Sequence, residues 1–327
     1  MSRQSGKRLA GVIVAAGLIM LGARSGRPEQ LGTDLGHARI SVHRSEDGSL
    51  KRGPRNEVET SNWSGYAVAN FSSGQAYTSA QASWSVPKVS YRTPPPVCHT
   101  MTIRGFTRQI CTSANVQAEY SSSWLGIGGY CENAGCSAVD NTLIQLGTEQ
   151  DVSSRGATQY YAWIEMLPNY PIVISPPSSY PNCDSLSCAY KVAPGDAITA
   201  SLSCESNCNN PGQTQSWYLT MSDTTQKWTF STTVSYASTL LSAEWIQEAP
   251  SSSAGVLPLA DFVTATFDPT VNAAGSAPNL TAADAILMVD PYGETSSPSP
   301  PETSPNLDAF TTCWGNNPNS IANCPAP

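Results

Sequence analysis

Short stretches of apolar and aromatic residues recur along the chain from Thr60 to its end. They are rich in Trp, Tyr, Val, Ile and Thr and are bounded by Gly, Pro, Asn or Ser, a pattern typical of β-strands separated by turns. No segment carries a convincing amphipathic helix of three turns. We predict strands at residues 62–68, 80–86, 123–127, 142–146, 160–166, 197–203, 216–221, 228–234, 243–248, 261–267 and 310–314.

Many short strands at regular spacing predict an all-β domain, either a sandwich or a barrel. Two segments interrupt the pattern. Residues 88–120 contain three consecutive prolines and two cysteines, and we expect a long loop stapled by a disulfide. Residues 295–305 are rich in Ser and Pro, which is consistent with an interdomain linker or a surface loop. We favour the loop, because the apolar strand that follows needs a sheet to join.

The first 23 residues have the pattern of a secretory signal peptide. Basic residues precede an apolar run from Leu9 to Leu21, and Gly22-Ala23 supplies small residues near a cleavage point. A membrane anchor is the alternative, but the apolar run is shorter than the roughly 20 residues that a span requires. We therefore expect a secreted, extracellular protein with no membrane attachment after cleavage.

Residues 24–58 have neither strand nor helix patterning, so we expect a propeptide or a disordered leader. This segment is net basic before Glu57, whereas the chain from Thr60 onward keeps only seven of the 17 Lys and Arg residues and 19 of the 25 Asp and Glu residues. We hypothesise that the leader binds and inhibits the acidic domain at neutral pH and is released in acid. The folded domain is then expected at 59–315 and a C-terminal tail, tethered by a disulfide, at 316–327.

The low number of charged residues beyond Thr60 indicates the pH at which the protein works. Few ionised carboxylates in salt bridges means that little stability is lost as pH falls, and few cations means little self-repulsion in acid. The composition is thus suited to an acidic environment, although a generic secreted protein with a polar surface is equally consistent with it. There is no basic patch to hold phosphates, which argues against a nucleic-acid partner.

Ten cysteines occur, and all of them fall as sequence neighbours in the second part of the chain. An even number of cysteines in an exported chain indicates disulfides, although sequence does not fix their connectivity. A zinc site is disfavoured by the spacing and by the scarcity of histidine. The simplest pairing joins Cys98 with Cys111, Cys131 with Cys136, Cys183 with Cys188, Cys204 with Cys208, and Cys313 with Cys324.

Catalytic sets that need an imidazole are disfavoured. His37 and His43 lie in the expected leader, and His99 lies in the long loop, where a surface residue is the better interpretation. The chain has no H-E-x-x-H sequence, no glycine-rich phosphate loop before a helix, and no D-T-G-like turn. Carboxylates remain the acid–base candidates, and we expect neither a metal nor a cofactor.

Three glutamates lie in predicted aromatic strands. Glu165 alternates with Trp163 and Leu167, and Glu244 alternates with Ile246 and Glu248. A carboxyl among aromatic side chains is desolvated, which raises its pKa and equips it to transfer protons. Alternation by itself is equally expected of an ordinary amphipathic strand whose acids face water.

Six motifs occur in one order along the chain. They are Ser61-Asn62-Trp63-Ser64-Gly65, Trp84-Ser85-Val86-Pro87, Ser123-Trp124-Leu125-Gly126-Ile127-Gly128-Gly129, Leu143-Ile144-Gln145-Leu146-Gly147, Tyr161-Ala162-Trp163-Ile164-Glu165-Met166-Leu167-Pro168 and Ala243-Glu244-Trp245-Ile246-Gln247-Glu248. Together they resemble the glutamic peptidases, or eqolisins, from about Ser61 to Trp314.

The resemblance implies a fold and a catalytic pair. The fold is an antiparallel β-sandwich of two sheets, of the concanavalin-like or jelly-roll type, curved to form a substrate groove. Gln145 matches the family's catalytic glutamine and Glu248 its catalytic glutamate. Trp124 matches a groove tryptophan, and Glu165 matches an acid near the site.

These assignments imply an acid endopeptidase. Glu248 is expected to activate water and Gln145 to stabilise the oxyanion. Unfolded polypeptides are the expected substrates of a monomeric enzyme. Trp63 and Trp124 are expected to contact the substrate, although the sandwich core is the alternative place for either ring.

Three other functions remain open at this point. A curved β-sandwich with exposed tryptophans is also suited to carbohydrate binding, as in a lectin. A retaining glycosidase could use Glu165 and Glu248, which would then lie about 5–5.5 Å apart. An inactive member of the family is the third possibility. Gln145 favours the peptidase, because neither a lectin nor a glycosidase needs an amide opposite Glu248.

Overall fold

The computed structural model describes residues 35–69, 71, 76–92, 97–103, 106–112, 117–174, 190–271, 278–303, 308–315 and 324–327. The expected signal peptide and the first part of the leader lie outside these residues. Each of the 11 strands that the sequence predicts is present. The prediction of an all-β fold is confirmed, because the described elements are strands and one short 3-10 helix.

The observed strands extend the predicted ones by a few residues at most ends. They are β1 (Val58–Thr60), β2 (Trp63–Ala69), β3 (Ser79–Ser85), β4 (Val97–Ile103), β5 (Phe106–Thr112), β6 (Glu119–Gly128), β7 (Leu143–Val152), β8 (Thr158–Met166), β9 (Ile172–Val173), β10 (Ala197–Ser206), β11 (Gln215–Asp223), β12 (Trp228–Tyr236), β13 (Ser242–Glu248), β14 (Ser251–Ser252), β15 (Gly255–Val256), β16 (Thr264–Thr270), β17 (Ala285–Val289), β18 (Thr295–Pro298) and β19 (Phe310–Gly315), with the helix at Ala282–Asp284.

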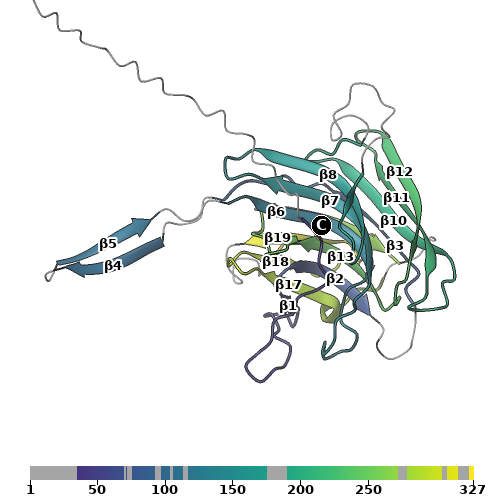
Figure 1. Ribbon diagram of the computed structural model, residues 1–327, viewed down its shortest axis with the longest axis horizontal. Coiled ribbons are helices and arrows are strands. Elements are labelled where there is room, and N and C mark those ends of the chain that lie inside the picture. The colour runs from purple at the N-terminus through teal and green to yellow at the C-terminus, as the bar shows by residue number, and fades with distance from the viewer. Residues whose placement is uncertain are drawn as a thin grey trace, which may run out of the picture. The chain divides into compact units, whose positions relative to one another are not determined.

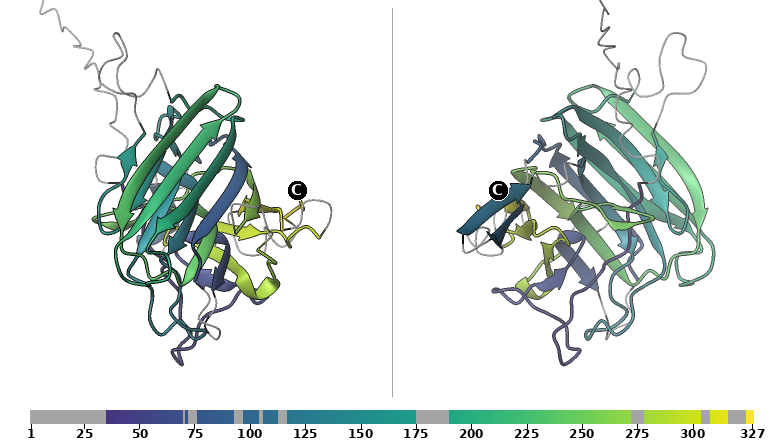
Figure 2. Two further views of the ribbon diagram at one scale, coloured as in Figure 1. Left: turned by 90° about the vertical axis from the view of Figure 1, so that its right-hand side faces the viewer. Right: turned by 60° about the vertical axis from the view of Figure 1, so that its left-hand side comes forward.

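The strands pair along one hydrogen-bonded path whose two arms face each other. The path runs β12-β11-β10-β3-β16-β19-β18-β17-β2-β13-β6-β7-β8-β9, and its neighbours are antiparallel. Strands β10, β11 and β12 lie side by side as a curved layer (Figures 1 and 2). Strands β13, β6, β7 and β8 form the other arm. The two-layer sandwich expected from the sequence is therefore confirmed.

Side chains alternate along strands β6, β7, β8 and β13 between the face that meets the sandwich core and the opposite face, which we call the second face. Leu125, Leu146 and Trp245 point into the core, where they pack with Leu219 and Trp217 of the opposite layer. Burying these large side chains contributes roughly 1.5–3 kcal/mol each. The residues between them on β6, β7, β8 and β13 therefore point away from the core, and these include Trp124, Gln145, Glu165 and Glu248.

The expectation of a surface loop at 295–305 is wrong for its first residues. Thr295–Pro298 form strand β18, which pairs with β17 on one side and β19 on the other, and all four residues are buried. Their side chains are small and short, so neither hydrophobicity nor alternation marks them as a strand. Pro298 stands at the strand's end, where a missing N–H does least harm to the ladder.

The segment 88–120 contains a β-hairpin where a loop was expected. Strands β4 and β5 pair in register, and Cys98 lies opposite Cys111. Three of the expected disulfides are confirmed, joining Cys131 to Cys136, Cys204 to Cys208, and Cys313 to Cys324. The side chains of Cys98, Cys111, Cys183, Cys188 and His99 lie outside the described residues.

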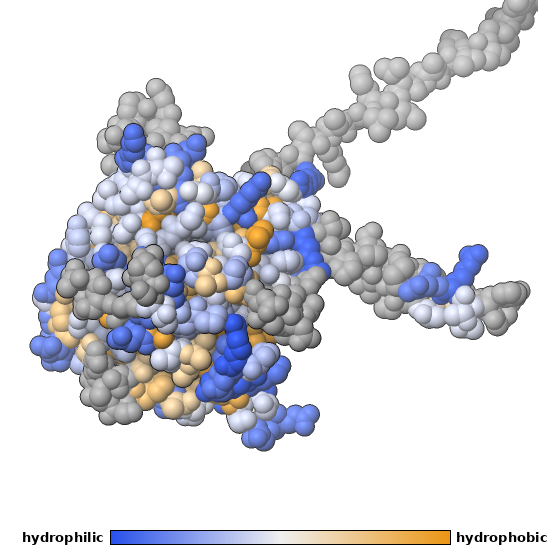
Figure 3. Space-filling view, turned by 180° about the vertical axis from the view of Figure 1, so that it is seen from behind, coloured by the Kyte–Doolittle hydropathy of each residue, from blue (hydrophilic) through white to orange (hydrophobic). Residues whose placement is uncertain are grey.

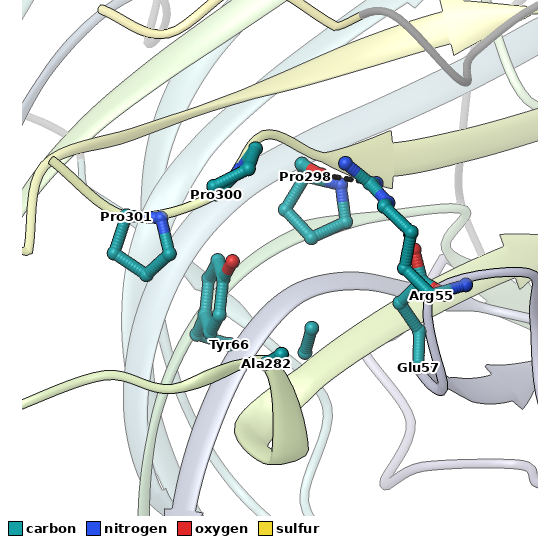
Figure 4. Close-up of a pocket in the computed structure, with 8 residues that line it drawn as sticks. Arg55, Glu57, Tyr66, Ala282, Pro298, Pro300 and Pro301 are labelled. Carbon is teal, nitrogen blue, oxygen red and sulfur yellow. Dashed lines mark hydrogen bonds and ion pairs between the residues drawn. The ribbon is translucent and has the colours of Figure 1, made fainter.

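The described part of the leader is packed against the domain. Arg55 donates hydrogen bonds to Ser297 Oγ at 2.7 Å and to the carbonyl of Pro298 at 2.6 Å, and it pairs with Glu57. Arg55, Glu57 and Pro298 line a cavity of about 60 Å³ together with Tyr66 (Figure 4). Leader and β18 are thus joined by polar contacts, although the two lie far apart in sequence.

The visible surface is mainly polar. On the face shown in Figure 3, pale blue and white dominate and the orange areas are small and scattered. No helix among the described residues is both long and apolar enough to cross a bilayer.

Gly147 allows β6 and β7 to approach each other beside the second face. A Cβ at this position would lie 2.5 Å from the carbonyl oxygen of Ser123 and 2.5 Å from Cβ of Trp124. We predict that Gly147→Ala lowers the free energy of unfolding by about 1–3 kcal/mol. In thermal unfolding, the Tm of this variant should lie below that of the wild type by roughly 2–4 °C for each kcal/mol of lost stability. Gly135→Ala is the control, because its Cβ would have only an ordinary contact, at 3.5 Å, with Asn133; equal Tm values for the two variants would contradict the argument.

Candidate active site

Gln145 and Glu165 are cross-strand partners on β7 and β8. The Gln145 Nε2 amide donates a hydrogen bond to Glu165 Oε2 at 2.9 Å, and both side chains are buried. The other amide atom, Gln145 Oε1, has no hydrogen-bond partner among the described residues. Glu165 therefore fixes the orientation of the amide and leaves its carbonyl oxygen available as an acceptor.

Glu248 is the last residue of β13 and lies opposite Trp63 of β2. Trp124 Nε1 donates a hydrogen bond to Glu248 Oε2 at 2.7 Å. The Trp124 and Trp63 rings meet edge to face at a centroid distance of 4.9 Å. Both rings are fully buried, but they belong to a cluster separate from the sandwich core. They therefore form part of the second face, where Trp124 positions the Glu248 carboxyl.

The leader crosses this face and lies between the two candidate catalytic side chains. The backbone N–H of His37 donates to Glu165 Oε2 at 3.1 Å, and Gln145 Nε2 donates to the His37 carbonyl at 3.1 Å. The N–H of Ala38 donates to Glu248 Oε1 at 3.1 Å. A peptide bond of the chain itself is thus held by Gln145 on its carbonyl side and Glu248 on its nitrogen side.

His37 is the site residue that sequence reasoning missed. It was set aside as a leader residue, yet its ring stacks on Trp163 with centroids 3.6 Å apart and an interplanar angle of 7°. Its Nδ1 lies 3.1 Å from Glu248 Oε2. The sequence offered one signal, a leader that holds two of the chain's three histidines, but nothing local relates His37 to a strand more than 200 residues away.

Further contacts hold the leader along the face. Trp63 Nε1 donates to the Ala38 carbonyl at 2.9 Å. The Asn62 side chain accepts from the N–H of Ser41 at 2.9 Å and donates to the Arg39 carbonyl at 3.1 Å. Earlier in the leader, Gly36 exchanges two backbone hydrogen bonds with Ser251, each at 2.8 Å. The segment therefore binds mainly through its backbone, in the way that an extended peptide adds to a sheet.

Burial raises the pKa of both acids that touch the leader. It raises the pKa of Glu165 to about 8, against the lowering effect of the hydrogen bonds from His37 N and Gln145. The pKa of Glu248 is raised well above its ordinary value by burial and then by the charge of Glu165, while the hydrogen bond from Trp124 opposes the shift. Burial lowers the pKa of His37. With the leader in place, Glu165 and Glu248 are therefore protonated in acid, and burial favours the neutral form of the His37 ring.

Two more acids, Glu149 and Asp151, follow Gln145 on the same face of β7. Both side chains are fully buried. The pKa of Glu149 is raised well above the ordinary value by burial and by the neighbouring Asp151, and burial raises the pKa of Asp151 to about 7. Glu149 Oε2 lies 3.5 Å from His37 Nε2. These two acids were not among the site residues that the sequence predicted.

Glu244 also lies on this face, two rows from Glu248 with Ile246 between them, and next to Gly126 of β6. It is fully buried, and burial raises its pKa well above the ordinary value. It makes no contact with the leader among the interactions of the described residues. In the described part of the chain, no three His, Cys, Asp or Glu side chains are grouped so as to hold a metal ion.

Comparison with protein-family models decides the family. The model of the peptidase A4 family matches residues 61–297. The chain belongs to this family. It is therefore a glutamic-type endopeptidase, a hydrolase that acts on polypeptides, as the resemblance of its motifs implied.

Two solved structures are similar at low identity. One is a crystal structure of Scytalido-glutamic peptidase with a peptide-based transition state analog, at 18% identity and TM-score 0.47, covering 78% of this chain and 98% of that one. The other is aspergilloglutamic peptidase from Aspergillus niger, at 20% identity and TM-score 0.37, covering 60% and 99%. A search among curated protein sequences gave no match.

The buried acids predict how stability changes with pH. Glu165 and Asp151 keep a proton in the folded state up to about pH 8 and 7, whereas an unfolded chain releases it near pH 4. The stability that these two acids contribute is complete below the pKa that they have in the unfolded chain. It is lost as pH rises through the higher pKa that they have in the folded protein. Each group then lowers the free energy of unfolding by up to about 1.4 kcal/mol per pH unit in that window.

We predict that the free energy of unfolding is greatest near pH 4 and falls towards pH 8. Urea unfolding followed by tryptophan fluorescence measures it, in chains that all carry Glu248→Gln so that self-digestion does not intervene. Adding Glu165→Gln should flatten the dependence, while Glu46→Gln, at an exposed turn, should not. A profile that rises from pH 4 to 8 would show that the buried acids are not protonated in the folded state.

Proposed function

We propose that this protein is a secreted endopeptidase that hydrolyses unfolded polypeptides in acid, with Gln145 and Glu248 as its catalytic pair. One observation carries the proposal. Gln145 and Glu248 engage the two ends of a single peptide bond, the carbonyl of His37 and the nitrogen of Ala38. Peptide hydrolysis requires groups at these two places, one for the oxyanion and one for the leaving amine.

The mechanism uses the contacts already made. Glu248, when ionised, takes a proton from a water molecule as the water attacks the carbonyl carbon. The carboxyl then gives a proton to the departing nitrogen, towards which its Oε1 already points. Gln145 Nε2 donates to the developing oxyanion, and Gln145 Oε1 accepts from the attacking water. Trp124 and Glu165 are positioning residues, since each holds one member of the pair by a hydrogen bond.

Burial also separates an inactive state from an active one. Under the leader, Glu248 is shielded from solvent and its pKa is raised, so the carboxyl is protonated and does not act as a base. Once the leader is gone, the face is open to water and the shift due to burial decreases. A glutamate near its ordinary pKa of about 4.3 is then ionised in part in weak acid.

The leader is proposed to inhibit the enzyme by occupying its substrate site. Residues 36–41 hold Gln145, Glu165 and Glu248 by hydrogen bonds, so a substrate can reach none of them while the leader remains. This supports the expectation that the enzyme's own leader is its inhibitor. Secretion and a monomeric state are parts of the same proposal; the polar surface of Figure 3 and three disulfides are consistent with them.

Release of the leader in acid has opposing electrostatic contributions. Lys51 pairs with Glu59 at 2.6 Å, and despite partial desolvation the hydrogen bonds from Lys51 and His43 lower the pKa of Glu59. The stabilisation that this pair gives is complete above the pKa that Glu59 has in an unfolded chain. It disappears as pH falls through the lowered pKa that Glu59 has in the folded protein. The acids beneath the leader act in the opposite direction, because their protonated forms favour the covered state. Acid alone therefore loosens the outer leader, and removal of its inner part calls for cleavage.

Removing either catalytic side chain should abolish acid proteolysis. We predict that Gln145→Ala lowers kcat on casein by about 10²–10³-fold. Glu248→Gln should lower it by at least about 10²-fold, because no group then moves the proton. Rates are measured from pH 2 to 7. Each variant is first treated with a trace of tagged wild type, later removed, so that a retained leader is not the cause of inactivity.

Glu244→Gln is the matched control, because Glu244 is an equally buried acid of the same strand face without a contact to the leader. It should retain activity. Full activity of Glu248→Gln would exclude the proposed acid–base role. No hydrolysis by the processed wild type at any pH would reject the peptidase function proposed for this site.

Loosening the leader should expose the site. Asn62→Ala removes the side-chain contacts to Ser41 and Arg39 without touching Gln145 or Glu248. In the Glu248→Gln background at pH 7, we predict that amide hydrogen exchange at residues 36–43 becomes roughly tenfold faster, as expected for lost hydrogen bonds. Ser137→Ala, on an exposed turn, is the control. If these amides are unprotected even without Asn62→Ala, the leader does not cover the site.

A further inference from the structure

The leader shows which peptide bond the site holds and which side chain precedes it. Gln145 contacts the His37 carbonyl and Glu248 contacts the Ala38 nitrogen, each at 3.1 Å. If Gln145 and Glu248 act as proposed above, the bond between His37 and Ala38 lies where hydrolysis occurs. The His37 side chain then occupies the S1 site, which receives the residue on the carbonyl side of the cleaved bond.

This S1 site has one aromatic wall and two acids. The His37 ring stacks on Trp163 at 3.6 Å. One ring nitrogen, Nδ1, lies 3.1 Å from Glu248 Oε2, and the other, Nε2, lies 3.5 Å from Glu149 Oε2. The side chains of His37, Glu149 and Glu248 have no solvent exposure. A flat ring with a polar atom at each side matches this arrangement.

Glu149 depends on the occupant of the site for a partner. The Glu149 side chain is fully buried beside Asp151, and neither of its carboxyl oxygens makes a hydrogen bond among the described residues. The His37 Nε2 atom has no hydrogen-bond partner among them either, and it faces Glu149 Oε2 at 3.5 Å. An unpaired buried carboxyl is costly, so the free energy of binding depends on what the occupant places beside it. Glu248, by contrast, is also held by Trp124 and Ala38.

We propose that Glu149 is a specificity-determining residue and that the enzyme cleaves preferentially after histidine. A neutral imidazole has one donor and one acceptor nitrogen, so it can pair with two carboxyls at once. A phenyl ring would stack on Trp163 but leave Glu149 unpaired. Lysine lacks the flat ring, and both lysine and arginine lack an acceptor atom. Histidine alone among these side chains combines a flat ring that stacks on Trp163 with a polar atom facing each acid.

The enzyme's own leader is then a substrate of this kind. On a processed molecule whose Glu248 is ionised, water adds to the His37 carbonyl carbon of another molecule's leader, and the bond to the Ala38 nitrogen breaks. One proton of the water passes through Glu248 to that nitrogen. The products are a carboxyl group on His37 and an amine on Ala38. Cleavage there separates the residues up to His37 from the later part of the leader, which is held by Asn62 at Ser41 and by the contact of Arg55 with β18.

The test compares pairs of synthetic peptides that differ only in having His or Phe before the cleaved bond. The acid-processed wild type should show a kcat/KM for the His peptide at least about tenfold higher, the factor expected when a buried carboxyl gains or loses its partner. Glu149→Leu should reduce that ratio about tenfold. Glu149→Gln, whose amide can still pair with the ring, should retain part of it. Glu244→Gln, a buried acid without a contact to the leader, should leave the ratio as it is.

A second readout uses the full chain. After transfer to acid, mass spectrometry should find a new N-terminus at Ala38 in the wild type and none in Glu248→Gln. Casein hydrolysis in acid without a preference for histidine, or with the same preference in Glu149→Leu, would overturn this inference and leave the proposed function intact. If the enzyme cleaves neither casein nor either peptide, both the histidine preference and the proposed peptidase function are overturned.

Discussion

The site depends on one constraint, the need to satisfy polar groups that are buried on a face of the sheet. Strands β7, β8 and β13 place Gln145, Glu149, Glu165 and Glu248 on the face opposite the core, where the leader excludes water. Each such group needs a hydrogen-bond partner or a proton, because an ionised carboxyl without either is very costly to bury. The leader supplies partners through the backbone of residues 37 and 38 and the ring of His37.

Backbone geometry makes this concentration of acids possible. Cross-strand partners in an antiparallel sheet lie about 5 Å apart, so residues from distant parts of the chain meet in rows. Gln145 thus meets Glu165, and Glu248 meets Trp63. The opposite face of the same strands carries Leu125, Leu146 and Trp245, whose burial in the sandwich holds the rows in place. The proposed catalytic arrangement is therefore rigid, because its reverse side is a hydrophobic core.

Sequence reasoning succeeded where a local pattern determines structure. Strands with aromatic and β-branched residues were found, as were three neighbouring cysteine pairs, and the motifs around Gln145 and Glu248 indicated the family that the family model confirms. It failed at β18, because Thr295–Pro298 are held by pairing with two flanking strands and not by their own preference. The two-stranded β4–β5 segment was missed for a similar reason, since prolines dominate its surroundings.

The leader was the hardest part to predict, and the reason is physical. Most of its contacts to the domain are made by backbone atoms, such as those of Gly36 and Ala38, and almost any sequence has these. Only His37 contributes a side chain suited to the site, and its partners come from strands that begin more than 100 residues later. A leader that binds through its backbone must also resemble a substrate, because an endopeptidase recognises extended chains in the same way. Under the proposed function, inhibition by the leader and cleavage of a substrate are two outcomes of one binding mode, separated by whether Glu248 is shielded or ionised.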